Sequence, residues 1–393
     1  MNVLLIGAGA VGGWIGGHLA HGGHSVMLVG RAPFVQAVRE RGFKVELPSG
    51  QSWVTRNLRA VETMDEAMQA QGSFHAPPYD AALVCVKAYD VAAVVETLRA
   101  AESAWRRADA AGSATSVVAF QNGVGSEEQL AAAFGVERVI AGTLTSPVSL
   151  VAPGVVRLAR AGGGVGLAPL STQHSSLSTR HSALSTQHST LITHRLSLLA
   201  DALRKSSLRV ETYADYRAMK WSKLLLNSVS NASSAILGMT PAEIYADPRL
   251  FRLEMRMLRE TLAVTRAAGI HMVNLPGAPA AWLARLARAL PDPVLQPLLR
   301  RSIARGRGDK MPSFYYDVPR ADGSQAARPS AGARCEVAWL NGAVAELGRQ
   351  LGIATPVNAA MTEVLTGLVT GREDTDAWRG QVERWVERCG VQG

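Results

Sequence analysis

The first third of the chain alternates short apolar runs with segments whose apolar residues recur at helical spacing. The apolar runs have the length of buried strands, and a helix is expected after the first of them, over Val11–His21. Because strands that alternate with helices build a mostly parallel sheet, this region predicts a doubly wound, Rossmann-type α/β domain. A hairpin over Pro153–Pro169 is expected to close it. The predicted strands are Val3–Ile6, Ser25–Val29, Ala81–Val86 and Ser116–Phe120.

Beyond about Thr193 the pattern becomes helical, which predicts an all-α second domain. A short strand over Val210–Thr212 is expected between the two domains. The predicted helices are Leu196–Ser206, Tyr216–Ile236, Leu250–Ala268, Pro279–Ala289, Glu336–Leu351 and Pro356–Val369.

A polar repeat separates the two patterns. Leucine recurs every seven residues from Leu170 to Leu191, among Ser, Thr, Gln and His. One apolar position per heptad is too few for a coiled coil, and the evenly spaced histidines are explained more simply by low complexity than by a metal site. We therefore expect residues 1–169 to form the cofactor domain, 170–194 a disordered inserted loop, and 195–393 the helical domain. A second exposed loop is expected over about 317–334.

Composition limits the class of protein. The 393 residues are 47% hydrophobic and 19% charged, with three cysteines, which suits a globular cytoplasmic protein without a disulfide framework. No apolar run is long enough for a membrane span, and the N-terminus lacks the basic region of a signal peptide. The net charge of +9 admits nucleic acid or small anions as partners. The one basic cluster, Arg300–Lys310, is interpreted as a solvated loop, and no nucleic-acid module accompanies it.

The sequence Gly7-Ala8-Gly9-Ala10-Val11-Gly12 follows the first strand and opens the first helix. In that context G-x-G-x-x-G predicts a dinucleotide site formed by Gly7, Gly9, Ala10, Val11 and Gly12. A purely structural glycine turn is the alternative.

The end of the second strand indicates which dinucleotide is bound. Arg31 stands where NAD-binding folds place an acid, and a guanidinium pairs with the 2′-phosphate of NADP. NADPH is therefore the expected cofactor.

Two polar turns follow later strands, at the sheet edge where such folds bind ligands. One carries Lys87, and the other carries Gln121, Asn122 and Gly123. Turn chemistry alone could account for either, because Asn-Gly is a common turn.

The helical region carries a polar stripe. Lys223, Asn227 and Asn231 recur every four residues in a predicted helix that is otherwise rich in leucine and valine. An ammonium can polarise a ketone and then donate a proton to the developing alkoxide, while amides bind oxygens without adding charge. The alternative is a lysine that extends to solvent and two asparagines that bridge helices.

These motifs, in order, resemble the ketopantoate reductase family. GAGAVG with Arg31, then VKAYD, QNGVG, WSKLLLNSVSN and CEVAWLNG match over nearly the whole chain. The resemblance implies NADPH-dependent reduction of ketopantoate to pantoate, on the route to pantothenate and coenzyme A. It implies that Lys223 is the catalytic lysine and Glu336 the motif glutamate that assists it. It further assigns Asn227, Asn231 and Ser313 to the substrate, Lys87 to the cofactor, and Asn122 to both.

Several alternatives stay open at this stage. The chain could reduce another 2-oxoacid, or be an opine-type or glycerol-phosphate-type dehydrogenase, because Lys310 and the long stretch before Glu336 depart from the family pattern. Two further alternatives, which the motifs favour less, are a non-catalytic NADP-binding regulator and a nucleic-acid-binding protein. No metal and no membrane partner are expected. The helical second domain suggests a homodimer, on which the sequence is otherwise silent.

Overall fold

The computed structural model describes residues 1–70, 79–106, 115–170, 183–307, 310–319 and 334–390. These residues divide into two compact units. Unit 1 contains Met1–Gln121, Gly125–Lys220 and Leu275–Ala278, and unit 2 contains Asn122–Val124, Trp221–Asn274 and Pro279–Gly393. The first unit therefore extends to Lys220, beyond the boundary predicted near residue 195.

Unit 1 is built on a sheet in the order β12-β11-β8-β7-β6-β1-β2-β5. The six strands from β8 to β5 are parallel, whereas β11 is antiparallel to β8. The strand order reverses at β1, as in doubly wound dinucleotide-binding folds. The strands are β1 Asn2–Ile6, β2 Ser25–Val29, β5 Leu58–Val61, β6 Ala81–Val84, β7 Ser116–Ala119, β8 Val139–Leu144, β11 Val165–Pro169 and β12 Val210–Thr212.

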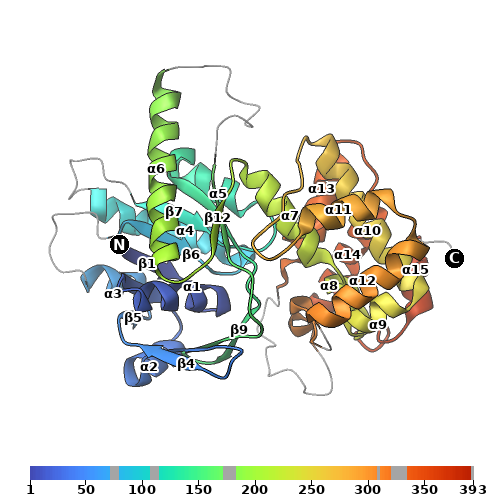
Figure 1. Cartoon of the computed structure of the whole chain (residues 1–393), viewed down its shortest axis with the longest axis horizontal. Coiled ribbons are helices and arrows are strands. Elements are labelled where there is room, and N and C mark those ends of the chain that lie inside the picture. Colours follow the sequence, from blue (N-terminus) through green and yellow to red (C-terminus); the bar gives the residue numbers. More distant parts are fainter. Residues whose placement is uncertain (71–78, 107–114, 171–182, 308–309, 320–333, 391–393) are drawn as a thin grey trace. The chain divides into compact units, whose positions relative to one another are not determined.

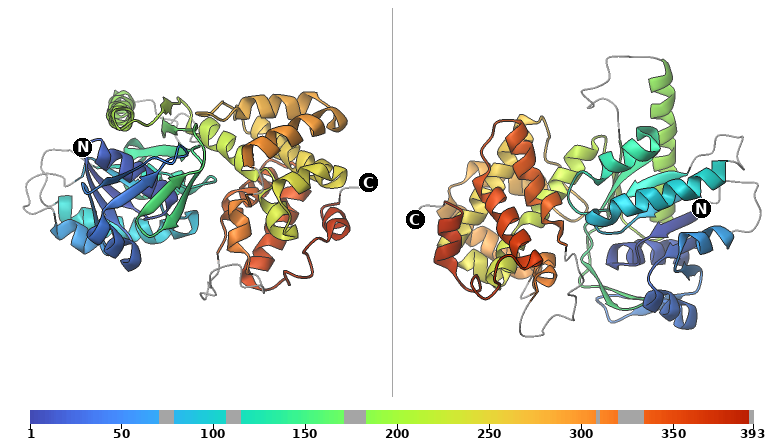
Figure 2. Two further views of the ribbon diagram at one scale, coloured as in Figure 1. Left: turned by 60° about the horizontal axis from the view of Figure 1, so that its bottom comes forward. Right: turned by 180° about the vertical axis from the view of Figure 1, so that it is seen from behind.

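Helices cover both faces of this sheet (Figures 1 and 2). One face carries α1 and α6, and the other carries α3, α4 and α5. The central strands β1, β6 and β7 are almost entirely apolar, as expected for a sheet that is covered on both faces. The helical elements of unit 1 are α1 Ala10–His21, α2 Ala32–Arg41, α3 Met64–Gln69, η1 Ala88–Asp90, α4 Val91–Arg106, α5 Ser126–Phe134, η2 Val136–Arg138 and α6 Ala183–Lys205.

A second, four-stranded sheet has the order β4-β3-β10-β9. Its strands are β3 Phe43–Glu46, β4 Ser52–Thr55, β9 Val148–Ala152 and β10 Val155–Leu158. The predicted hairpin over Pro153–Pro169 is wrong, because β10 pairs with β9 while β11 joins the large sheet. Between β10 and β11, Gly162 and Gly163 adopt φ of +105° and +82°, a left-handed course that redirects the chain.

The predicted disordered loop over 170–194 is wrong in its second half. Helix α6 begins at Ala183, while residues 171–182 lie outside the described part of the chain. Ile192, Leu196, Leu199 and Leu203 recur at helical spacing and are buried in the core of unit 1. This apolar stripe extends the predicted helix Leu196–Ser206 toward the N-terminus, into the segment that was expected to be disordered.

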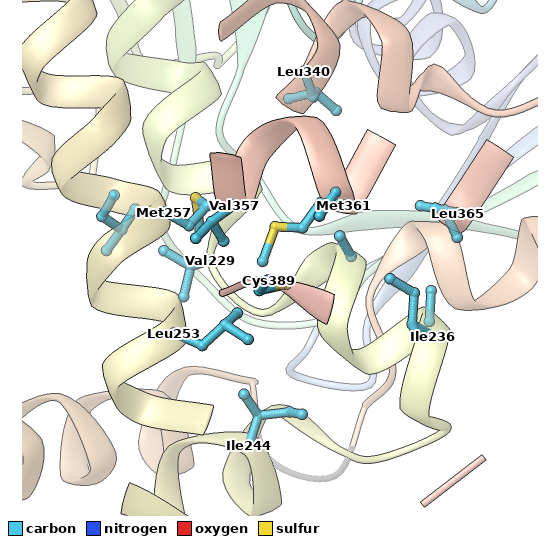
Figure 3. Packing of buried hydrophobic residues seen from close by; sticks show 14 of the residues in the cluster. Val229, Ile236, Ile244, Leu253, Met257, Leu340, Val357, Met361, Leu365 and Cys389 are labelled. Atoms are coloured by element: carbon cyan, nitrogen blue, oxygen red, sulfur yellow. The ribbon is translucent and has the colours of Figure 1, made fainter. Parts of the chain in front are cut away.

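Unit 2 is helical, with α10 at its centre. The core side chains of α10 include Leu253 and Met257, which belong to the same buried cluster as Val357, Met361 and Leu365 of α14 (Figure 3). The basic cluster Arg300–Lys310 was predicted to be a loop, but it is helical as far as Arg307. The second predicted loop, over 317–334, lies mostly outside the described residues. The elements are α7 Tyr216–Ser228, of which Tyr216–Lys220 belongs to unit 1, α8 Asn231–Leu237, α9 Pro241–Ala246, α10 Pro248–Ala267, α11 Ala280–Ala289, α12 Asp292–Arg307, η4 Ser313–Asp317, η5 Glu336–Trp339, α13 Asn341–Gln350, α14 Pro356–Thr370 and α15 Val382–Arg388.

Two predicted helices are interrupted, and the prediction of continuous helices is wrong there. The segment Tyr216–Ile236 breaks between α7 and α8, where Ser230 adopts a left-handed φ of +52°. The buried Glu254 carboxylate accepts the Ser230 N–H at 2.7 Å and stabilises this break. The segment Glu336–Leu351 is likewise the short η5 followed by α13, with the break at Leu340. Among the described helices, none is long and apolar enough to cross a bilayer.

Candidate active site

The glycine turn, which we define as residues 7–12, lies at the carboxyl end of β1. Gly7 has φ of +113°, and a Cβ there would lie 2.7 Å from the main chain of Cys85. A Cβ on Gly12 would lie 2.2 Å from the Gly7 carbonyl oxygen, so this close approach of α1 to the turn requires glycine. Gly9 differs, since a Cβ there would meet no protein atom within 4 Å. The space beside Gly9 at the start of α1 is open to a ligand.

Arg31 and Lys87 lie at the same edge of the sheet as the glycine turn. A Cβ on Gly30, next to Arg31, would come within 2.6 Å of Ala8. Lys87 is half-buried just beyond β6, and its carbonyl accepts the Asp90 N–H at 2.9 Å to open η1. Between β6 and Lys87, burial raises the pKa of the Cys85 thiol, which stays neutral beside the turn. The glycine turn, Arg31 and Lys87, which the sequence analysis assigned to the cofactor, thus lie at one edge of the sheet in unit 1.

The turn after β7, Asn122–Val124, belongs to unit 2 although β7 belongs to unit 1. The Val124 N–H donates to the Trp339 carbonyl at 3.1 Å. Gly123 has φ of +79°, and a Cβ there would lie 2.2 Å from the same carbonyl oxygen. Only glycine allows this approach, which fixes the adjacent Asn122 against η5.

Asn122 is the middle of a hydrogen-bonded series that we call the polar chain: Asn227, Asn122 and Glu336. The Asn227 Nδ2 donates to the Asn122 Oδ1 at 3.0 Å, and the Asn122 Nδ2 lies 3.5 Å from the Glu336 Oε2. Glu336 is buried at the start of η5. Lys223 is half-buried on α7, one helical turn before Asn227. An ammonium, two amides and a carboxylate are therefore gathered in unit 2, which is the equipment needed to bind oxygens and move a proton.

Asn231 and Ser313 form a separate pair. The Asn231 Nδ2 donates to the Ser313 Oγ at 3.3 Å, and its Oδ1 accepts the Phe314 N–H at 3.1 Å. Because the break at Ser230 ends α7, Asn231 does not continue the helical stripe of Lys223 and Asn227 as the sequence predicted. Asn231 is buried and holds the start of η4, whereas Ser313 is exposed.

The sequence reasoning missed a buried ion pair in unit 1. The Lys220 Nζ lies 2.7 Å from the Glu127 Oε1, and neither side chain is more than 2% exposed. The signal was present, since Lys220 stands one helical turn before the fully buried Leu224 on an apolar stripe. Among the described residues, no group of three His, Cys, Asp or Glu side chains could hold a metal ion.

Comparison with known proteins identifies the family. A model described as ketopantoate reductase PanE/ApbA matches residues 3–171, and the model of its C-terminal part matches residues 215–369. The chain belongs to the ketopantoate reductase family. The resemblance, the fold class and the prediction of an oxidoreductase are thereby confirmed, as is the coarser statement that the cofactor is a nicotinamide dinucleotide.

Several relatives match nearly the whole length of this chain. The 2-dehydropantoate 2-reductase of Halobacterium salinarum is 27% identical over 366 residues, covering 93% of this chain and 98% of that protein. A solved ketopantoate reductase from Ralstonia eutropha has a TM-score of 0.66 at 25% identity, covering 95% of this chain and 99% of its own. A D-mandelate dehydrogenase solved with NADH and anilino(oxo)acetate has a TM-score of 0.67 at 20% identity, covering 94% and 99%. At that identity the likeness shows the fold alone.

Proposed function

We propose that this protein uses NADPH to reduce ketopantoate to pantoate, the precursor of pantothenate and coenzyme A. The observation that supports this most strongly is the polar chain of Asn227, Asn122 and Glu336, beside Lys223 on the same helix as Asn227. Family membership supports the substrate. Its relatives carry the name 2-dehydropantoate 2-reductase.

The residues of unit 1 fit a dinucleotide phosphate. The first amides of α1 have no partner within the helix and point toward its N-terminus, where an anion is stabilised. The open space beside Gly9 allows a pyrophosphate to approach the main chain. The exposed guanidinium of Arg31 can pair with a 2′-phosphate through two parallel hydrogen bonds. Lys87 adds a second positive charge at the same edge.

A bound reduced nicotinamide supplies the hydride, which forms a new C–H bond at the keto carbon. Lys223 donates a proton to the oxygen as the carbonyl π bond breaks, so that a hydroxyl group forms. Before that step its positive charge polarises the carbonyl. Lys223 then regains a proton from solvent.

The polar chain orients this chemistry. Glu336 accepts from Asn122, which leaves the Asn227 amide group fixed in one orientation beside Lys223. Asn122 and Asn227 can then hydrogen-bond to the hydroxyl and carbonyl oxygens of the substrate without adding charge. The exposed hydroxyl of Ser313, held by Asn231, is available to the substrate carboxylate.

The test is a cofactor and substrate matrix with purified protein. NADPH and NADH are each followed by absorbance while ketopantoate and several other 2-oxoacids are supplied. Turnover restricted to NADPH with ketopantoate supports both parts of the proposal. A preference for another 2-oxoacid would retain the reaction and discard the substrate, and a preference for NADH would overturn the role given to Arg31.

A further inference from the structure

The mechanism above does not use the buried ion pair of unit 1. Lys220 is among the largest fully buried side chains of the described residues, although it carries a charge. Burial raises the pKa of Glu127, an effect that the positive charge of Lys220 opposes. A buried pair of this kind is often no more stabilising than apolar residues of the same size, because both ions lose their hydration. Stability alone is therefore a weak reason for its presence.

The ammonium of Lys220 reaches beyond Glu127 to two main-chain carbonyls. The Nζ donates to the Gln121 carbonyl at 2.5 Å and lies 3.5 Å from the Gly142 carbonyl. An ammonium has three N–H donors, and that of Lys220 is surrounded by one carboxylate and two carbonyl oxygens. The Gln121 carbonyl belongs to the peptide group that leads directly into Asn122.

The Gln121 side chain extends this restraint across the sheet edge. Its Nε2 donates to the Val84 carbonyl at 2.8 Å and to the Val86 carbonyl at 3.2 Å. Val86 immediately precedes Lys87. One buried residue therefore links the turn after β7 to the turn after β6, and Lys220 holds the main chain of that residue.

Lys220 also anchors the helix that carries the proposed acid. It stands three residues before Lys223, and both lie within α7. Unit 1 ends at Lys220 along this helix and at Gln121 along the turn. The two segments that carry Lys223 and Asn122 therefore leave unit 1 from residues that are hydrogen-bonded to each other.

We propose that Lys220 and Glu127 are a positioning pair for the reduction. Lys220 holds Asn122 and Lys223 in place by binding the Gln121 carbonyl, and Glu127 keeps the ammonium at that carbonyl. The pair itself does not touch the substrate. This inference rests on the proposed function, since the reaction gives Asn122 and Lys223 their roles.

Two variants separate positioning from stability. Lys220→Met removes the ammonium at similar length and leaves a buried carboxylate, so both the unfolding midpoint and the activity are expected to fall. The double variant Lys220→Met with Glu127→Gln removes both charges, and the unfolding midpoint is expected to recover. Because the Gln121 carbonyl still lacks its donor, kcat is expected to stay about tenfold or more below wild type, with little change in the KM for NADPH. Arg349→Met, which breaks the exposed pair with Glu346, is the control expected to change neither.

Hydrogen exchange gives a readout that does not depend on turnover. Amides of residues 122–124 and 221–226 are expected to exchange faster in both Lys220 variants, while the rest of unit 2 is unchanged. Unchanged exchange in these segments, or recovery of kcat in the double variant, would overturn the positioning role. A wild-type protein that reduces no 2-oxoacid would overturn the proposed function instead, and the exchange measurement would still decide whether the pair restrains the two segments.

Discussion

The glycine turn of unit 1 and the polar chain of unit 2 differ in how far apart their parts lie in the sequence. The turn consists of six consecutive residues. The polar chain joins Asn227 to Asn122 across 105 positions and Asn122 to Glu336 across 214. The turn is therefore specified by local backbone requirements, whereas the polar chain exists only after unit 2 has packed. A substitution in the turn should act on cofactor binding or local folding, and one in the polar chain should act on the chemistry.

The largest effect is expected at the proposed acid. Lys223→Ala removes the group that polarises and protonates the carbonyl, and kcat should fall by roughly a hundredfold or more. NADPH affinity should stay near wild type, because the glycine turn is untouched. The measurement is steady-state kinetics together with cofactor titration by fluorescence. The exposed Lys205 provides the control Lys205→Ala, and a near-normal kcat for Lys223→Ala would remove Lys223 from the mechanism.

Arg31→Gln tests the cofactor side of the comparison. Hydrogen bonds to charged groups contribute about 1.5–3 kcal/mol, so the KM for NADPH should rise by roughly 10–100-fold. The KM for NADH should change little, since NADH has no 2′-phosphate. The exposed Arg41, at the end of the same helix α2, gives the control Arg41→Gln. An equal loss with both cofactors would mean that Arg31 contributes to general binding and not to selection.

Two alanine substitutions within the turn should have opposite signatures. Gly9→Ala adds a methyl group to open space, so the unfolding midpoint should stay unchanged while NADPH affinity falls by about tenfold. Gly12→Ala places a methyl group against the Gly7 carbonyl, so the unfolding midpoint should fall. Calorimetric titration and thermal unfolding of the two proteins measure both quantities. Normal NADPH affinity in Gly9→Ala would show that the pyrophosphate does not approach there.

His18 sharpens the comparison, because it gives unit 1 a long-range polar contact of its own. Its Nδ1 lies 3.1 Å from the Ser206 carbonyl, 188 positions away, and its ring packs against Trp14 and Trp53. Burial is the main reason why the pKa of His18 is lowered from 6.5 to about 4; the Ser206 carbonyl opposes this shift and the nearby His21 adds to it. The folded state therefore holds the neutral ring, while the unfolded state binds a proton as the pH falls below 6.5.

The contribution of neutral His18 to the free energy of unfolding is present above pH 6.5 and is lost as the pH falls toward 4. Between pH 8 and pH 6 the expected loss is about 1 kcal/mol of unfolding free energy, the smallest effect considered. Urea unfolding at several pH values measures it. His18→Gln should lack this component of the pH dependence, whereas the control His194→Gln, at an exposed position, should retain it. Identical pH slopes for wild type and His18→Gln would contradict the assignment.

The sequence predicts the parts of the fold that depend on local pattern. The strands Ser25–Val29 and Val210–Thr212 were located to the residue, because short apolar runs between helices leave few alternatives. The prediction of a hairpin over Pro153–Pro169 failed because two apolar runs around glycines have the same sequence pattern whether they pair with each other or join different sheets. Pairing is decided by partners outside the predicted hairpin: β10 pairs with β9 and β3, and β11 pairs with β8 and β12.

The candidate site shows the same limit. Spacing alone gave Lys223 and Asn227 one face of a helix, and the structure retains that relation. It could not reveal that Ser230 adopts a left-handed conformation, because the carboxylate that accepts its N–H comes from Glu254 on another helix. For the same reason the link from Asn122 to Glu336 had no local signal, and the sequence analysis did not single out Lys220.

Asn122–Val124 belongs to unit 2, although its neighbours in the sequence belong to unit 1, and Leu275–Ala278 has the reverse relation. The Pro276 carbonyl accepts the Thr145 hydroxyl at 2.6 Å within unit 1. During synthesis on the ribosome, unit 1 therefore cannot be completed until residue 278 has emerged, when part of unit 2 already exists. A gene cut at Lys220 would give one fragment without its Pro276 contact and another without Asn122. This enzyme is expected to resist dissection into two independently folding halves.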